Sequence, residues 1–151
     1  MESFPTRILL ATDGSADAEL ALRAAVNLAN RTDSELHIVT VGPEYHPPFD
    51  IPEYGEQLEE TLRRLERGAR KTLDEQVQKI REAGGTVAEA HLRPGGRRDQ
   101  QIVRLAEEIA ADLIVIGSRG LGGVRRALMG SVSDSVVRHA HCPVLVVRKE
   151  K

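Results

Sequence analysis

A basic, glycine-rich stretch near the end of the chain has the residue types that bind anions. The run GSRGLGGVRRALMGS, from Gly117 to Ser131, contains five of the chain's 13 glycines and no carboxylate. Its positive side chains are those of Arg119, Arg125 and Arg126. Glycine lets a ligand approach main-chain amides that a Cβ atom would shield. A helix beginning at about Ser131 would add unpaired N–H groups and the hydroxyls of Ser131 and Ser133. The pattern favours a phosphate-binding loop over a plain turn with solvated arginines.

The stretch does not match the common phosphate-binding motifs. The chain has no G-x-x-x-x-G-K-[ST] sequence and therefore no Walker lysine. In GSRGLG the glycines stand at positions one, four and six, whereas a dinucleotide fingerprint requires positions one, three and six. Neither the P-loop NTPases nor the nicotinamide-dependent dehydrogenases are supported.

A second candidate lies near the N-terminus, in RILLATDGS. Asp13 follows an apolar run and precedes Gly14 and Ser15. In an open parallel sheet, ligands bind at the carboxyl ends of strands where the strand order reverses, so the Asp13 carboxylate could bind sugar hydroxyls or a metal. The alternative is that Asp13 only caps the following helix. The residues alone leave both open.

The spacing of apolar runs predicts the elements that must position these residues. Strands are predicted at Arg7–Ala11, Leu36–Val41, Thr86–Leu92, Leu113–Ile116 and Val144–Val147. The first, fourth and fifth are apolar at consecutive positions, which indicates that both faces of the sheet are covered. Segments of helical period alternate with the strands. We therefore predict an α/β fold with a single open five-stranded parallel sheet and helices on both faces, Rossmann-like in type.

The predicted helices raise three local questions. Apolar spacing predicts a helix over Glu53–Ala83, about 45 Å long, whereas a domain of this length has a diameter of about 38 Å. The helix must therefore overhang the domain or bend, with Gly68 the weakest point. Asp99 is the predicted N-cap of the next helix. The proline-rich segment 42–52 is either a lid over the site or a plain connector.

Composition limits the class of protein. A chain of 151 residues is sufficient for one core, so residues 1–151 are expected to form one domain. The formal net charge of -2 and the scarcity of aromatic side chains, with two Tyr, two Phe and no Trp, argue against nucleic acid and anionic membranes as partners. A single cysteine and no long apolar segment favour a cytoplasmic location.

The histidines do not show the spacing of a metal site. His139, His141 and Cys142 lie within four residues, but residues two apart on a helix point away from each other. His46 and His91 have no cysteine or carboxylate cluster at ligand spacing. No metal site is expected, and Cys142 is expected to be an inert apolar residue.

With both halves of the candidate site identified, the sequence resembles the universal stress protein family over about Arg7 to Arg148. The most specific element is the pattern Gly-x2-Gly-x9-Gly-Ser/Thr, which here is Gly117, Gly120, Gly130 and Ser131. In that family this pattern separates members that bind ATP from those that do not. The family fold is a five-stranded parallel sheet of the adenine nucleotide α-hydrolase type.

The resemblance implies roles for particular residues. Ala11, Thr12 and Asp13 would line the nucleoside end, and Val41 would meet the adenine. The loop glycines would wrap the ribose and phosphates together with Ser131, Val132 and Ser133. Arg119 is added because of its charge alone. The implied cofactor is ATP, with Mg²⁺ or Mn²⁺ held mainly by its phosphates. The implied assembly is a homodimer through the last strand, Pro143–Val147.

Three functions follow from these features. The first is a nucleotide-binding regulatory or stress-response protein in which turnover is not required. The second is a slow ATPase, or a phosphoryl or adenylyl transferase, on the same scaffold. The chain has no Walker lysine, no His-x-Gly-His element and no evident base besides Asp13, which favours the first over the second. The third is a structural dimer that binds no nucleotide.

Overall fold

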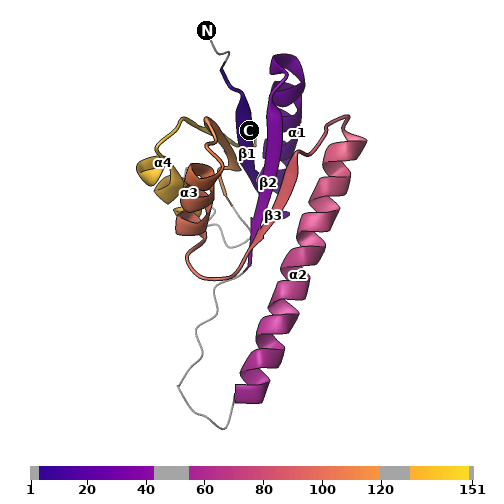
Figure 1. The fold of residues 1–151 in the computed structure, drawn as a ribbon, viewed down its shortest axis with the longest axis vertical. Helices are drawn as coiled ribbons and strands as arrows, with labels where there is room; N and C mark the ends of the chain where they lie inside the picture. Colours follow the sequence, from indigo (N-terminus) through magenta and orange to yellow (C-terminus); the bar gives the residue numbers. More distant parts are fainter. Residues whose placement is uncertain (1–3, 43–54, 120–129, 150–151) are drawn as a thin grey trace.

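The computed structural model describes residues 4–42, 55–119 and 130–149 of the chain. Its strands form one parallel five-stranded sheet in the order β3-β2-β1-β4-β5. The strands are β1 (Arg7–Ala11), β2 (Glu35–Val41), β3 (Glu89–Arg93), β4 (Leu113–Gly117) and β5 (Val144–Val147). The predicted α/β architecture is confirmed, and Figure 1 shows helices on both sides of the sheet.

Two apolar layers hold the helices on the sheet. The helices are α1 (Ala16–Thr32), α2 (Gly55–Glu82), α3 (Arg98–Glu108) and α4 (Ser131–His139). Ile8 and Leu10 of β1 pack in a cluster with α1 and α2, whereas Leu9 and Ala11 pack in a cluster with α3 and α4. Alternate residues of a strand face opposite sides of the sheet. The consecutive apolar residues of β1 are therefore explained by cores on both faces.

The strand bounds differ most from expectation at β3. The predicted strand began at Thr86, but β3 begins at Glu89. The first amide of this segment that bonds to β2 is that of Ala88, which donates to the carbonyl of Leu36 over 2.8 Å. Thr86 and Val87 have strand-forming side chains but precede this pairing. Their composition therefore extended the predicted strand too far.

Helix α2 overhangs the sheet. It runs as one helix from Gly55 to Glu82 and continues through Gly68, and its N-terminal half extends well beyond the strands in Figure 1. Leu73 and Ile80, in the C-terminal half, are fully buried, whereas Leu62 is 46% exposed. Of the two predicted alternatives, an overhang or a bend, the structure has the overhang, and Gly68 does not interrupt the helix.

Asp99 was predicted to be the N-cap of α3, and this is wrong. The N-cap is Arg97, and Asp99 lies in the first turn. The Asp99 carboxylate accepts hydrogen bonds from the hydroxyl of Ser135 on α4 over 2.6 Å and from Arg97 over 2.9 Å. Burial alone would raise the pKa of Asp99, but these hydrogen bonds outweigh it and lower the pKa. Asp99 therefore links α3 to α4.

None of the helices in the described part of the chain combines the length and the apolar composition needed to cross a bilayer.

Candidate functional site

The strand order puts the two halves of the predicted site side by side. The chain passes from β1 through β2 to β3 on one side of the sheet, and then from β4 to β5 on the other. The order therefore reverses between β1 and β4, and Ala11 lies opposite Ile116 in the parallel register. The residues after β1 and those after β4 leave the same edge of the sheet. This edge is where open parallel sheets bind ligands.

Thr12, directly after β1, is bonded within the protein. Its amide donates to the carbonyl of Val39 over 3.0 Å. Its hydroxyl donates to the side-chain oxygen of Gln76 on α2 over 3.0 Å, and both residues are buried. No sequence pattern pointed to Gln76, which stands 64 positions away. The Thr12 side chain therefore holds β1 to α2.

Asp13 shapes the turn into α1 without capping the helix. Its Oδ1 accepts a hydrogen bond from the amide of Ser15 over 2.9 Å. Ser15 is the N-cap, and its Oγ accepts from the amide of Ala18 over 3.2 Å. The Ser15 hydroxyl also lies 3.3 Å from the carbonyl of Arg119, to which it donates. The turn after β1 is thereby tied to the loop after β4, and Asp13 is half-buried at the junction.

Gly117 is required by the approach of α1. A Cβ atom at this position would lie 2.7 Å from the backbone carbon of Asp17 and 2.8 Å from the amide nitrogen of Ala18. The sequence predicted that glycine here allows a ligand to approach the main chain. Gly117 is not among the positive-φ glycines of the described residues. The group that approaches it is the first turn of α1.

Asp17 is a buried acid in the first turn of α1. Its carboxylate accepts a hydrogen bond from the Ser118 hydroxyl over 2.7 Å, and both side chains are buried. The Nε of Arg119 lies 3.8 Å from the same oxygen. Asp17 therefore positions the start of the glycine-rich loop. Its place two residues after the N-cap serine was the only signal in the sequence.

The first turn of α4 contains three amides with no acceptor among the described residues. Helix α4 begins at Ser131 as predicted, with Gly130 as N-cap and no side-chain cap. The first amide with a helical acceptor is that of Asp134, which donates to the Gly130 carbonyl. Among the described residues, no acceptor is recorded for the amides of Ser131, Val132 and Ser133. Helix N-terminal amides left in this way bind anions.

Other donors predicted to face the site are bonded within the protein. The amide of Ser118 donates to the Val147 carbonyl, and that of Gly130 donates to the Ser118 carbonyl. The Ser133 hydroxyl donates to the carbonyls of Ser118 and Gly130, at 2.7 and 3.1 Å. The amides of Ser118 and Gly130 are therefore already bonded within the protein and are not available to a ligand. Among the described residues, the amides without an acceptor in the protein include those of the first turn of α4.

Val41 ends β2 on the face covered by α3 and α4, where it belongs to the same apolar cluster as Ala11. The structure does not describe Gly120, Arg125, Arg126, His46 or most of the proline-rich segment.

Cys142 is half-buried against the apolar cluster that contains Ala11, and desolvation raises the pKa of its thiol, as expected of an inert cysteine. His139 lies beside Ser135, whereas His141 faces Glu107.

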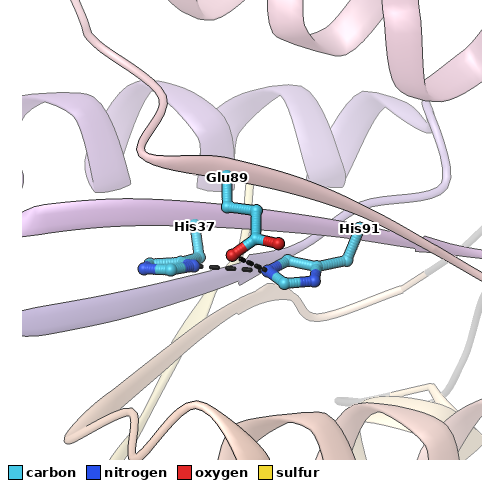
Figure 2. Close-up of side chains that lie close together, drawn as sticks. All are labelled: His37, Glu89 and His91. Carbon is cyan, nitrogen blue, oxygen red and sulfur yellow. Dashed lines mark hydrogen bonds and ion pairs between the residues drawn. The ribbon is translucent and has the colours of Figure 1, made fainter.

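The expectation that His91 has no ligand cluster is wrong. His37 of β2 and His91 of β3 face each other with 3.3 Å between His37 Nδ1 and His91 Nε2, and the Glu89 carboxylate lies 3.8 Å from the same His91 nitrogen. Figure 2 shows the three side chains converging. Desolvation lowers the pKa of His91, opposed by Glu89. This cluster is not evident from the sequence because its two histidines are 54 positions apart.

Comparisons with known proteins agree with the fold and with the family resemblance. A model described as the universal stress protein family matches residues 5–148. A putative universal stress protein of Staphylococcus aureus is 39% identical over 145 residues, which cover 95% of this chain and 84% of that protein. The solved universal stress protein UspA of Lactobacillus plantarum has a TM-score of 0.83 at 27% identity, covering 97% of this chain and all of the other.

A further solved relative carries a ligand. The universal stress protein of Archaeoglobus fulgidus in complex with dAMP has a TM-score of 0.67 at 28% identity and covers 96% of this chain and 99% of its own.

Proposed function

Because the chain belongs to the universal stress protein family, we propose that it is a nucleotide-dependent regulatory protein of the cytoplasm. It binds an adenine nucleotide, ATP in the first place, where β1 and β4 end. The Archaeoglobus relative with bound dAMP supports the class of ligand. The Gly117, Gly120, Gly130 and Ser131 pattern supports the choice of ATP. Any Mg²⁺ or Mn²⁺ would be held mainly by the phosphates.

The observation that carries the proposal is the start of α4. Three successive amides, those of Ser131, Val132 and Ser133, have no recorded acceptor among the described residues, and Gly130 provides no side-chain cap. The helix dipole adds positive potential at the same point. Arg119 follows the end of β4. Donors of this kind bind the oxygens of a phosphate chain.

The remaining residues would hold the nucleoside. The carboxylate of Asp13 would accept hydrogen bonds from the ribose hydroxyls, and the apolar side chains of Ala11 and Val41 would lie against the adenine. Thr12 would contact the nucleoside only through atoms not already bonded to Val39 and Gln76. Ser133 would contribute its amide, because its hydroxyl is used within the protein. Gly117 would act through its close contact with α1, which fixes the start of the loop, and Gly120 would keep the loop close to the phosphates.

The edge of the sheet supports a homodimer. Strand β5 is at one end of the sheet and pairs only with β4 among the described strands. Leu145 of β5 is 40% exposed and Val137 of α4 is 43% exposed. An apolar edge strand pairs readily with a second copy of itself. Nucleotide bound where β1 and β4 end, with its phosphates at the start of α4, would then bias the affinity or the shape of the dimer.

The test uses proline at Ser131 to remove one of the proposed phosphate donors. Ser131 is the first helical residue, where proline is well tolerated, and Gly130 has the extended ψ angle, 166°, that proline requires of its predecessor. Ser131→Pro removes the amide hydrogen, whereas the matched control Ser131→Ala removes only the hydroxyl. We expect Ser131→Pro to weaken ATP binding by more than Ser131→Ala, in calorimetry of the full chain, with both variants keeping the wild-type melting temperature without ligand.

Two outcomes would contradict the proposal. The first is a wild-type chain whose melting temperature does not rise with millimolar ATP, because a ligand that binds only the folded state must stabilise it. The second is phosphate release at the rate of an ordinary kinase, about 1–100 per second, abolished by Asp13→Asn. That result would favour the enzymatic alternative over the regulatory one.

A further inference from the structure

Two strands at the far side of the sheet place three metal-ligating side chains together, away from the proposed nucleotide site. His37 of β2 lies opposite Glu89 of β3 in the parallel register, and His91 follows two residues later. Because alternate residues share a face, His37, Glu89 and His91 all lie on the α3 side of the sheet. His37 is buried, His91 is intermediate and Glu89 is exposed.

From this cluster we propose that His37, Glu89 and His91 form a binding site for one divalent transition-metal ion, with Zn²⁺ as its first candidate. Two imidazoles and a carboxylate are a ligand set that such ions prefer, and they leave a fourth position for water. This site goes beyond the nucleotide-binding function and shares no residue with it.

The distances fit a tetrahedral ion. Ligand nitrogens about 2.0–2.1 Å from a tetrahedral Zn²⁺ stand about 3.3 Å from each other, and His37 Nδ1 and His91 Nε2 are 3.3 Å apart. Candidate ligand atoms of all three residues lie within 4.8 Å of one another. The Glu89 carboxylate is 3.8 Å from His91 Nε2, and its side chain, 65% exposed, has room to move closer. Small rotations of the side chains are sufficient to bring three ligand atoms onto one ion.

A carboxylate also orients the buried ligand. His37 Nε2 lies 3.4 Å from Glu35, whose carboxylate is in turn held by Arg7 over 2.7 Å. An N–H on Nε2 that donates to Glu35 leaves the lone pair of Nδ1 directed toward His91. Metal-ligating histidines are commonly fixed in this way by a carboxylate behind the ring. Glu35 is therefore a positioning residue for the proposed site.

The two arginines near the cluster, Arg93 and Arg7, are each paired with a carboxylate. The nearest cationic side chain on β3, that of Arg93, forms an ion pair with Glu108 at the end of α3. Arg7 is paired with Glu35. With both arginines neutralised by carboxylates, Glu89 remains to balance the charge of the ion.

The experiment is a Zn²⁺ titration of the full chain after chelator treatment, without nucleotide, by competition with a chromophoric chelator. We expect one Zn²⁺ per chain. Glu89→Gln and His91→Gln should each weaken binding by at least about tenfold, and Glu35→Gln by about tenfold. The matched control His141→Gln removes a histidine that also faces a carboxylate, Glu107, but lies outside the cluster, and should not change the affinity.

Two further readouts separate a bound ion from general charge effects. Zn²⁺ should shift the imidazole NMR signals of His37 and His91 and leave those of His139 and His141 unchanged. Mg²⁺, which prefers oxygen ligands, should not compete with Zn²⁺.

Glu89→Gln changes an exposed side chain, so the fold of this variant and its response to ATP should match those of the wild type. The proposal is overturned if the chain binds no Zn²⁺, if Glu89→Gln and His91→Gln bind it as tightly as the wild type, or if Mg²⁺ competes equally. The histidine pair would then be only a hydrogen bond between two strands.

Discussion

The hydroxyl of Ser118 donates a 2.7 Å hydrogen bond to the carboxylate of Asp17, a residue 101 positions earlier in the chain. Both side chains are buried where the end of β4 meets the first turn of α1. The same carboxylate lies near Arg119. One acid therefore positions the first residues of the proposed phosphate-binding loop.

Removing the Asp17 carboxylate should lower the free energy of unfolding. Asp17→Ala leaves the buried Ser118 hydroxyl without its acceptor, which costs about 1–3 kcal/mol. Urea denaturation measures this change. Glu19→Ala, in the same turn but with a partly exposed side chain that pairs, in the described part of the chain, with Arg23 and Lys79, is the matched control and should change the value by at most about 1 kcal/mol. Equal effects of the two substitutions would show that the buried bond contributes nothing.

Two glycine-to-alanine substitutions should have opposite effects. Gly117→Ala places a Cβ atom 2.7 Å from the α1 backbone, and overpacking of this kind costs about 1–3 kcal/mol. Gly68→Ala adds a Cβ atom to an exposed helical position with no atom within 4 Å, and alanine there should stabilise the helix by up to about 1 kcal/mol. Thermal unfolding measures whether each substitution raises or lowers the melting temperature. A neutral Gly117→Ala would contradict the close approach of α1.

Asp112 should make stability depend on pH in the acid range. Burial by itself would raise the pKa of Asp112, but hydrogen bonds from the amides of Arg7 and Thr6 and from the Thr6 hydroxyl outweigh it, so the folded-state pKa is lowered. A lowered pKa contributes stability above the unfolded value of about 3.9, and this stability is lost as pH falls through the folded pKa.

Denaturant titrations at several pH values test this assignment. Asp112→Asn should reduce stability at neutral pH and flatten the loss of stability below about pH 4. Asp74→Asn, which removes one negative charge at an exposed position of α2, should keep the acid-dependent loss of the wild type. If the loss of stability at acid pH is unchanged in Asp112→Asn, other carboxylates cause it.

A charge on the edge strand should dissociate the proposed dimer. Leu145→Lys places like charges near each other across a two-fold pairing of β5, and lysine on an edge strand opposes pairing. We expect a monomer in analytical ultracentrifugation, with an unchanged circular dichroism spectrum. Leu62→Lys, on the overhanging half of α2 and similarly exposed, should stay dimeric. A wild-type monomer, or dissociation by Leu62→Lys alone, would place the interface elsewhere or remove it.

The pattern of apolar residues was sufficient to predict the central strands, because β1 and β4 are buried on both faces and have no polar interruptions. The same reasoning was less accurate at β3, an edge strand whose residues are exposed or half-buried. Asp99 was misplaced as a cap because its partner, Ser135, is on a different helix. Composition near a helix start cannot distinguish a cap from a contact between helices.

The sequence by itself determined the strand and helix segments, the start of α4 at Ser131 and the glycine pattern of the family, because all of these depend on neighbours a few positions apart. Only the tertiary structure decided that Asp17 meets Ser118, that Thr12 meets Gln76 and that His37 meets His91. The physical reason is the parallel topology. Each crossover brings together residues separated by tens of positions, and the strand register that selects those pairs is set by packing on both faces of the sheet.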